Sequence, residues 1–398
     1  MSRSLRPYPV WGEQYIDPAS FEQMDRAVSL PVAVAGALMP DAHVGYGLPI
    51  GGVLATRGVV IPYAVGVDIA CRMRLTIFPD KPQVLRARAD RLKKVLLEET
   101  LFGTGGEWKS NARAAHPVLD EKTWTETKLL RMLLDKASRQ LGTSGSGNHF
   151  VEWGEFELAQ DDGATGLKAG AYLALLSHSG SRGVGYQIAD FYSRLAMELR
   201  ANLDKELRHL AWLDLKSNAG QEYWLSMELA GRFAAANHEI IHQRIAKAAG
   251  LKPLFSVENH HNFAWKEKHH GEDVIVHRKG ATPAAKGVLG IIPGSMGDPG
   301  FLVRGKGHRG SLNSAAHGAG RVMSRRAAFN SLTKKVRNEY LLAAGVTLLG
   351  GDLDESPQAY KRIEEIMAAQ EDLIEVVGRF MPRIVRMDES GGKGRRED

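Results

Sequence analysis

The stretch SAAHGAGRVMSR, residues 314–325, surrounds His317 with small residues and follows it with two arginines. A neutral imidazole is a competent nucleophile toward phosphorus near neutral pH. Glycine and alanine would let a bulky anion approach the ring, and Arg321 and Arg325 stand at helical spacing, as if on one face. The pattern therefore fits a nucleophilic histidine. It equally fits a loop that runs into a helix with a solvated arginine face.

A second set of residues has the chemistry of metal ligands. A carboxylate three residues from a thiol can hold one ion, or two if the sulfur bridges, and distant imidazoles can complete the coordination. This donor mixture suits manganese, zinc, iron or cobalt, whereas magnesium prefers oxygen ligands alone. Taken singly, each histidine is as well explained by ordinary structure. The five candidates stand at turns after apolar runs: Asp68 and Cys71 in VGVDIACR, His149 in GSGNHF, His178 in LLSHSGSRG and His261 in NHHNF.

Chemistry at phosphorus also requires groups that surround the phosphate oxygens. SGSRGVG with Arg182, HRKGATPAAKG and PGSMG could supply them. No GxxxxGK[ST] phosphate loop occurs, and no KxDG segment offers a lysine nucleophile. If a nucleotide is activated covalently here, His317 is the candidate that carries it.

Composition excludes several classes of protein. With 398 residues, of which 43% are hydrophobic and 25% charged, the chain can bury a large core. A single cysteine excludes an internal disulfide. We find no apolar run long enough to span a membrane and no signal peptide, so we expect a soluble, cytoplasmic-type protein without a membrane partner. The net charge of +6, with clusters such as RLKK and KKVR, favours a polyanionic partner, although a solvated surface explains any one cluster.

The elements that must position these residues can be read from residue patterns. Short β-branched and apolar runs between residues 31 and 78 predict strands, as do residues 273–280 and 287–297. Residues 127–142 predict a helix with a terminal glycine. Residues 169–185 predict a buried strand that opens into a glycine-rich loop over 177–185.

Two longer segments have the apolar spacing of helices. Residues 187–248 are predicted to be largely helical with a polar break, and residues 357–381 to form a long C-terminal helix. The tail, residues 389–398, has the composition of a disordered segment. We expect one large α+β domain over residues 1–388, with a helical insertion at about 187–248.

Eight motifs in this order resemble the RtcB-type RNA ligases, over roughly residues 8–387. They are MPDAHVGYGLPIGG, VGVDIACR, GSGNHFVE, SHSGSRGVG, HHNF, HRKGATPA, IIPGSMG and HGAGRVMSR. The resemblance implies an RtcB-like fold with mixed β-sheets around a metal-lined cleft. It also implies a GTP- and manganese-dependent ligase that joins RNA 3′-phosphate or 2′,3′-cyclic phosphate ends to 5′-hydroxyl ends, in tRNA splicing or RNA repair. An archease-type activator is a further partner that the resemblance suggests.

The resemblance also implies roles for single residues. Cys71 would be shared by two manganese ions, with His149 on one, Asp68 and His261 on the other, and His178 serving the cluster. His317 would take GMP, and Asp41 would sit at the catalytic centre. The residues expected along the nucleotide or the RNA are Asn148, Asn262, Ala319 and Gly320 for the nucleotide, Glu152 and Ser295 for its guanosine, and Arg182 and Arg325 for RNA phosphates.

The sequence departs from the family pattern at the guanine end of that pocket. Where family members end in lysine and glycine, this chain has Asp388 and Glu389 and then nine further residues, among which Lys393 could substitute. Gly300 stands where a serine is often found. These departures leave the choice of nucleotide base open.

The sequence by itself is also compatible with other functions. A metal-dependent RNA end-healing phosphodiesterase would use the same ligands without sealing the strand, and would need no GMP adduct on His317. A non-catalytic RNA-binding protein would have kept only the fold. The HHN letters also occur in nucleases, although so short a motif is common by chance.

Overall fold

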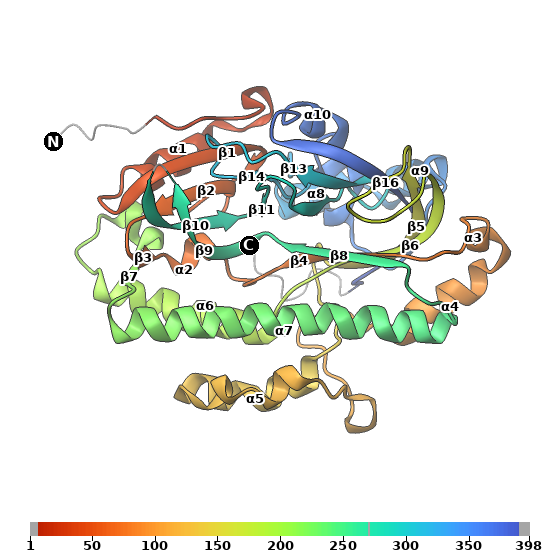
Figure 1. Ribbon diagram of the computed structural model, residues 1–398, viewed down its shortest axis with the longest axis horizontal. Helices are drawn as coiled ribbons and strands as arrows, with labels where there is room; N and C mark the ends of the chain where they lie inside the picture. The colour runs from red at the N-terminus through yellow and green to blue at the C-terminus, as the bar shows by residue number, and fades with distance from the viewer. Residues whose placement is uncertain (1–6, 270, 390–398) are drawn as a thin grey trace.

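The computed structural model describes residues 7–269 and 271–389, and its largest sheet has eight strands and lies in the right half of Figure 1. Its strands are β4 (Arg72–Ile77), β5 (Phe150–Leu158), β6 (Gly170–Ser179), β8 (Phe255–His260), β12 (Leu289–Ile292), β13 (Gly300–Gly305), β15 (Thr347–Leu349) and β16 (Ile374–Met387). The order is β12-β13-β16-β5-β6-β4-β8, with β15 parallel to β16 and the other pairs antiparallel. The expected α+β class with mixed sheets is therefore confirmed.

The two ends of this sheet approach each other. The amide of Asn259 on β8 accepts a hydrogen bond from the backbone N–H of Ile291 on β12 at 2.8 Å and donates one to the Ile291 carbonyl at 3.4 Å. Alternate side chains of the strands point inward and form one apolar cluster that includes Leu75, Leu176 and Phe380. The sheet is thus nearly closed around its own core.

A second sheet lies beside the first. Its strands are β1 (Ala33–His43), β2 (Ile50–Thr56), β10 (Glu272–Lys279) and β9 (Asn262–His269), in that order. The expected strands within residues 31–78 and 273–280 are confirmed. Only one residue, His261, separates β8 from β9, so the two sheets meet there. Two small pairs complete the β-structure: β3 (Val59–Val60) with β7 (Leu213–Asp214), and β11 (Ala281–Pro283) with β14 (Ser314–Ala316).

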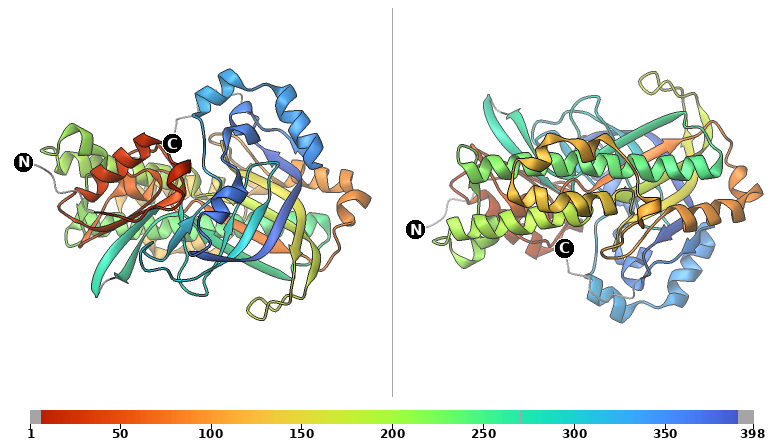
Figure 2. Two further views of the ribbon diagram at one scale, coloured as in Figure 1. Left: turned by 90° about the horizontal axis from the view of Figure 1, so that it is seen from above. Right: turned by 90° about the horizontal axis from the view of Figure 1, so that it is seen from below.

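Two helices, α6 (Arg182–Leu199) and α7 (Asn218–Ala249), lie beneath the sheets in Figure 1, and α5 (Lys128–Gln140) lies below them, nearest the viewer in the right-hand view of Figure 2. The expected helix at 127–142 is confirmed, with Thr127 capping its start and Gly142 in a left-handed conformation after its end. The largely helical character expected over 187–248 is also confirmed, but the interruption between Leu199 and Asn218 is longer and starts earlier than the predicted polar break. The glycine-rich loop expected over 177–185 is wrong in extent, because α6 already begins at Arg182.

Other helices are shorter. They are α1 (Pro18–Val28), α2 (Pro62–Val65), α3 (Val84–Ala87), α4 (Ala89–Glu99), α8 (Arg325–Ser331), α9 (Lys334–Ala344) and α10 (Ile363–Ala368). Single 3-10 turns are η1 (Glu13–Tyr15), η2 (Ser110–Ala112), η3 (Pro117–Asp120), η4 (Lys122–Thr125), η5 (Lys205–Leu210), η6 (Leu353–Glu355) and η7 (Pro357–Ala359). Among the described residues, no helix combines the length and apolar character that crossing a membrane requires.

The long helix predicted for residues 357–381 is wrong. Only α10 is helical there, and the chain then enters β16, which is hydrogen-bonded on both sides to β13 and β5. Pairing with these strands overrides the helical spacing of the apolar residues. Pro382 is accommodated at an irregularity in the β16–β5 register. Of the predicted tail, residues 390–398, including Lys393, lie outside the described residues.

Candidate active site

Four adjacent strand ends build the centre of the site. The strands β5, β6, β4 and β8 are neighbours and antiparallel, so the starts of β5 and β4 lie at the same edge as the ends of β6 and β8. The register pairs Phe150 with His178, and Arg72 with both Ser179 and His260. His178 and the residues next to these pairs, His149, Cys71 and His261, therefore gather at one place.

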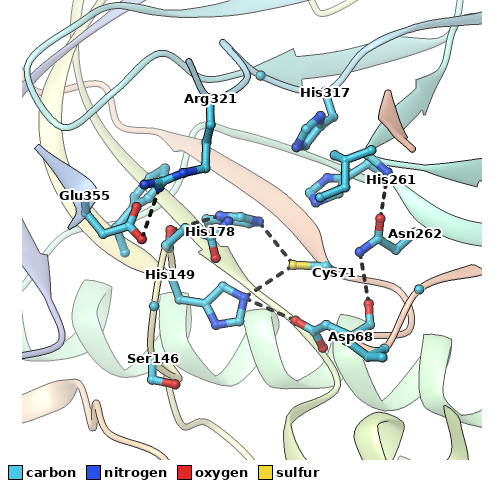
Figure 3. Close-up of a pocket in the computed structure, with 18 of the residues that line it drawn as sticks. Asp68, Cys71, Ser146, His149, His178, His261, Asn262, His317, Arg321 and Glu355 are labelled. Carbon is cyan, nitrogen blue, oxygen red and sulfur yellow. Dashed lines mark hydrogen bonds and ion pairs between the residues drawn. The ribbon is translucent and has the colours of Figure 1, made fainter. Parts of the chain in front are cut away.

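The Cys71 sulfur lies at the middle of this group (Figure 3). Its Sγ is 3.1 Å from His178 Nε2 and 3.4 Å from His149 Nε2. These three buried ligand atoms lie within 4.8 Å of one another. Asp68 Oδ2 is 3.1 Å from His149 Nε2, and the His261 ring centroid is 5.2 Å from that of His178. All five residues expected as ligands are thus brought together.

The protonation states suit a metal ion. Burial lowers the pKa of His178 to about 3, helped by His149 and His317, and lowers the pKa of His261 well below its ordinary value. Burial alone would raise the pKa of Asp68, but the hydrogen bond and charge of His149 and the charge of Arg182 lower it. His261 Nδ1 is buried and has no hydrogen-bond partner among the described residues. A buried thiol, the neutral imidazoles of His178 and His261 and an ionised carboxylate can hold a divalent cation.

His317 stands next to this cluster, on the loop after β14. Pairing of β14 with β11 places the ring 4.8 Å from the His261 ring, centroid to centroid. Its Nδ1 is 2.7 Å from Oδ2 of Asp41, a fully buried residue of β1. The same oxygen accepts the backbone N–H groups of His317 at 3.0 Å and Gly318 at 3.3 Å. This arrangement places the Nδ1 proton toward Asp41 and leaves Nε2 with its lone pair.

Lys361 holds the backbone on both sides of Asp41. Its ammonium group donates to the backbone carbonyls of Pro40 at 3.2 Å and Ala42 at 2.7 Å, the residues on either side of Asp41. Burial lowers the pKa of Lys361 to about 8, while the charge of Asp41 acts in the opposite direction. Sequence reasoning did not identify Lys361, because it is far from Asp41 along the chain and belongs to no recognised motif.

A single cavity of about 1030 Å³ joins these groups. Of the expected site residues, all line it except Asp41, which lies behind His317. The residues expected along the nucleotide or its guanosine are among them: Asn148, Glu152, Asn262, Ser295, Ala319 and Gly320. Burial raises the pKa of Glu152 well above its ordinary value, which favours a neutral carboxyl group. The cavity is large enough for a nucleotide beside the cluster of candidate metal ligands.

Close backbone packing explains why the third residue after His317 is a glycine. Gly320 has a φ of 74°, and a Cβ atom there would come within 2.1 Å of the Asp41 carbonyl oxygen. Asn262, which also lines the cavity, accepts the backbone N–H of Gly280 with its side-chain oxygen at 2.8 Å. Backbone packing thus limits the side-chain size at Gly320, and Asn262 holds the backbone at Gly280.

The two arginines expected at RNA phosphates have different surroundings. Arg182 lies 3.2 Å from His149 Nδ1 through its Nη1, next to the cluster. Arg325 forms ion pairs with the buried carboxylates of Asp354, at 3.0 Å, and Glu355. Arg321 also reaches Glu355, at 3.7 Å.

The predicted helical face shared by Arg321 and Arg325 is wrong. Arg321 forms a β-bridge with Tyr360, and α8 begins only at Arg325 after its cap Ser324. The two guanidinium groups nevertheless meet at the same carboxylate. The carboxylates Asp354 and Glu355 were missed, because nothing in their local sequence marks them as part of the site.

The positions that depart from the family pattern lie away from the cavity wall. Asp388 is buried, and its carbonyl accepts the backbone N–H of Gly351 at 3.1 Å. Gly300 opens β13, opposite Phe380 of β16. Met387 is the residue at this end of the described chain that lines the cavity.

Comparisons with known proteins match nearly the whole chain. A family model described as tRNA-splicing ligase RtcB matches residues 23–388. The RNA-splicing ligase RtcB of Escherichia coli is 34% identical over 368 residues, covering 86% of this chain and 87% of that protein. Its counterpart in Mycobacterium tuberculosis is 33% identical over 430 residues, covering 90% and 98%. The tRNA-splicing ligase RtcB of Thermococcus kodakarensis is 30% identical over 453 residues, covering 93% of each.

Proposed function

Because the chain belongs to the RtcB family of tRNA-splicing ligases, and is thus an RNA ligase by family, we propose that it seals RNA by way of GMP carried on His317. The ends joined are an RNA 3′-phosphate, or a 2′,3′-cyclic phosphate after its hydrolysis, and a 5′-hydroxyl. The observation that supports this most directly is the 2.7 Å contact between Asp41 and His317 Nδ1, which leaves Nε2 as the nucleophile.

The covalent cycle follows from that tautomer. His317 Nε2 attacks the α-phosphorus of GTP, forming a P–N bond while pyrophosphate leaves. The ring becomes positively charged, and Asp41, on the Nδ1–H side, stabilises that charge. The RNA 3′-phosphate oxygen then attacks the same phosphorus, and the P–N electron pair returns to Nε2. Finally the 5′-hydroxyl oxygen attacks the RNA phosphorus, its proton is lost, and GMP leaves.

Cys71, His149 and His178, with Asp68 and His261, are the residues that would hold metal, which we propose to be two manganese ions. Bound metal would supply charge neutralisation at the phosphate oxygens. Arg182 and Arg325 would meet RNA phosphates at the cavity wall. The end chemistry and an archease-type activator are likewise part of this proposal.

GTP is proposed as the nucleotide, with Glu152 and Ser295 toward its base and Asn148, Asn262, Ala319 and Gly320 along the rest. Since Asp388 does not line the cavity, the terminal lysine of other family members has no counterpart there among the described residues. Labelling with each of the four nucleoside triphosphates in turn would measure the base selectivity that remains.

The decisive experiment incubates the protein with α-labelled GTP and manganese, without RNA. Label should remain on the denatured parent protein through an acid-labile bond, and should be absent from His317→Ala. His308→Ala, which changes a partly exposed histidine outside the cavity lining, should label like the parent. An unlabelled parent that still hydrolyses cyclic phosphate ends would instead identify an end-healing phosphodiesterase.

A further inference from the structure

Three aromatic side chains contact one another beside the cavity, one of them lines it, and the cycle proposed above does not use them. Tyr46 lies on the loop between β1 and β2, Tyr63 on α2 and His209 on η5. The ring centroids are 6.4 Å apart for Tyr46 and Tyr63, 5.8 Å for Tyr46 and His209, and 5.1 Å for Tyr63 and His209. Tyr46 is 41% exposed and also lines the cavity that contains His317. We call these three residues the aromatic mouth.

The loop that carries Tyr46 is held in place. The side chain of Gln23 accepts the backbone N–H of Gly45 at 3.0 Å and donates to the carbonyl of the same residue. Gly47 has a φ of 70°, and a Cβ atom there would come within 2.7 Å of the His209 carbonyl oxygen. The exposed ring of Tyr46 therefore sits on a fixed support, which lowers the entropy lost on binding.

Lys279 connects the loop that carries Tyr46 to the chain segment next to His317. Its ammonium group donates to the Tyr46 carbonyl at 2.6 Å. The next residue is Gly280, where a Cβ atom would lie 3.1 Å from Cε1 of His317. The aromatic mouth and the nucleophile are thus connected through two consecutive residues of one chain segment.

The charge around the aromatic mouth favours a polyanion that carries flat rings. Lys279 and Arg208 stand close enough to His209 to help burial lower its pKa, so its ring is neutral near pH 7. Aromatic faces beside cations are the usual binding surface for single-stranded nucleic acid, in which bases stack and phosphates pair. A buried core cluster would have no exposed ring, whereas Tyr46 and His209 are both exposed.

We propose that the aromatic mouth stacks one unpaired base of the RNA strand whose end reacts at His317, with Tyr46 as the main contact. This inference rests on the proposed function, because it assigns a place to the RNA that the cycle consumes. It assigns Tyr46 to RNA binding, not to chemistry on the nucleotide.

The test separates nucleotide transfer from RNA binding. Tyr46→Ala, Tyr46→Phe and Phe191→Ala are compared, since Phe191 is exposed on α6 and does not line the cavity. Each is assayed for label from GTP in the absence of RNA, and for sealing of two short RNAs over a range of RNA concentrations. We expect parental labelling for all three, since that step involves no RNA. Sealing by Tyr46→Ala should show a KM for RNA raised about 5- to 150-fold, which corresponds to one stacked base, while Tyr46→Phe and Phe191→Ala stay close to the parent.

A second experiment removes a base from the RNA instead of the aromatic ring of Tyr46 from the protein. A series of RNAs each carries one abasic nucleotide, placed at increasing distance from the junction. At one of these positions, the missing base should raise the KM of the parent protein to that of Tyr46→Ala. The same RNA should not raise the KM of Tyr46→Ala any further. A parental KM for Tyr46→Ala, additive losses at every position, or loss of labelling along with sealing would overturn the proposal. Absence of label from the parent protein would instead reject the proposed function itself.

Discussion

Asp41 Oδ2 lies 2.7 Å from His317 Nδ1, although the two residues are 276 positions apart in the chain. The same oxygen also receives the backbone N–H groups of His317 and Gly318. One carboxylate oxygen thus sets both the position of the imidazole and the nitrogen that carries its proton.

Replacing Asp41 by asparagine should slow GMP transfer to the protein by about 10²- to 10⁴-fold, the range found when a base loses the group that orients it. The amide cannot stabilise the positively charged ring as a carboxylate does. The measurement is the rate of label incorporation at saturating GTP, with Asp161→Asn, an exposed aspartate on the surface, as the control. If Asp41→Asn takes up label at the parental rate, Asp41 does not contribute to the transfer of GMP.

Replacing Cys71 by alanine should abolish RNA sealing and lower manganese affinity by at least about 10- to 100-fold, because the sulfur lies between two imidazoles. The folded state should persist, since alanine is smaller than cysteine and fits into the space that cysteine leaves. Metal content by mass spectrometry and thermal unfolding without metal are the two readouts. Cys71→Ser, which keeps an oxygen donor, should retain more metal than Cys71→Ala; equal metal content in all three proteins would argue against a thiolate ligand.

Arg325 should be important for stability as well as for RNA. Replacing it by methionine removes an ion-pair partner from the buried carboxylates of Asp354 and Glu355, a change that costs about 3–5 kcal/mol in comparable sites. Denaturant unfolding at pH 7 measures the loss. Adding Asp354→Asn to Arg325→Met should recover part of it, because Asp354 loses its ion pair with Arg325 whereas Glu355 keeps the one with Arg321. No recovery in the double variant would mean that the two residues are not coupled.

The buried His277 predicts a loss of stability in acid. Its Nε2 accepts the backbone N–H of Ile61 at 2.9 Å, and burial lowers its pKa from the ordinary 6.5 to about 4. The unfolded chain then binds a proton between pH 6.5 and pH 4 that the folded chain does not. The stabilisation is complete above pH 6.5 and is lost as the pH falls toward 4, by about 3 kcal/mol for this group.

His277→Gln isolates that contribution. Glutamine can still accept from Ile61 but does not titrate, so its free energy of unfolding should fall less than that of the parent between pH 7 and pH 5. The other buried histidines act equally in both proteins and cancel in the comparison. Identical losses in the two proteins would show that His277 is not the cause.

Much of the site could be predicted from the sequence because its residue types are local and chemically distinctive. The sole cysteine, the carboxylate three residues before it and histidines at turns after apolar runs marked the five candidate ligands before any contact was known. The helix at 127–142 was likewise predictable, since its cap, its apolar spacing and its terminal glycine are all read within one segment.

Only the tertiary structure decided which distant segments are in contact. The strand β16 is stabilised by pairing with β13 and β5, so local spacing predicted a helix in its place. The carboxylates that bind Arg325 and the lysine behind Asp41 come from segments with no recognisable motif of their own. Residue types are fixed by the sequence, but the distances between them depend on sheet register, and register is set by pairing energies summed over the whole fold.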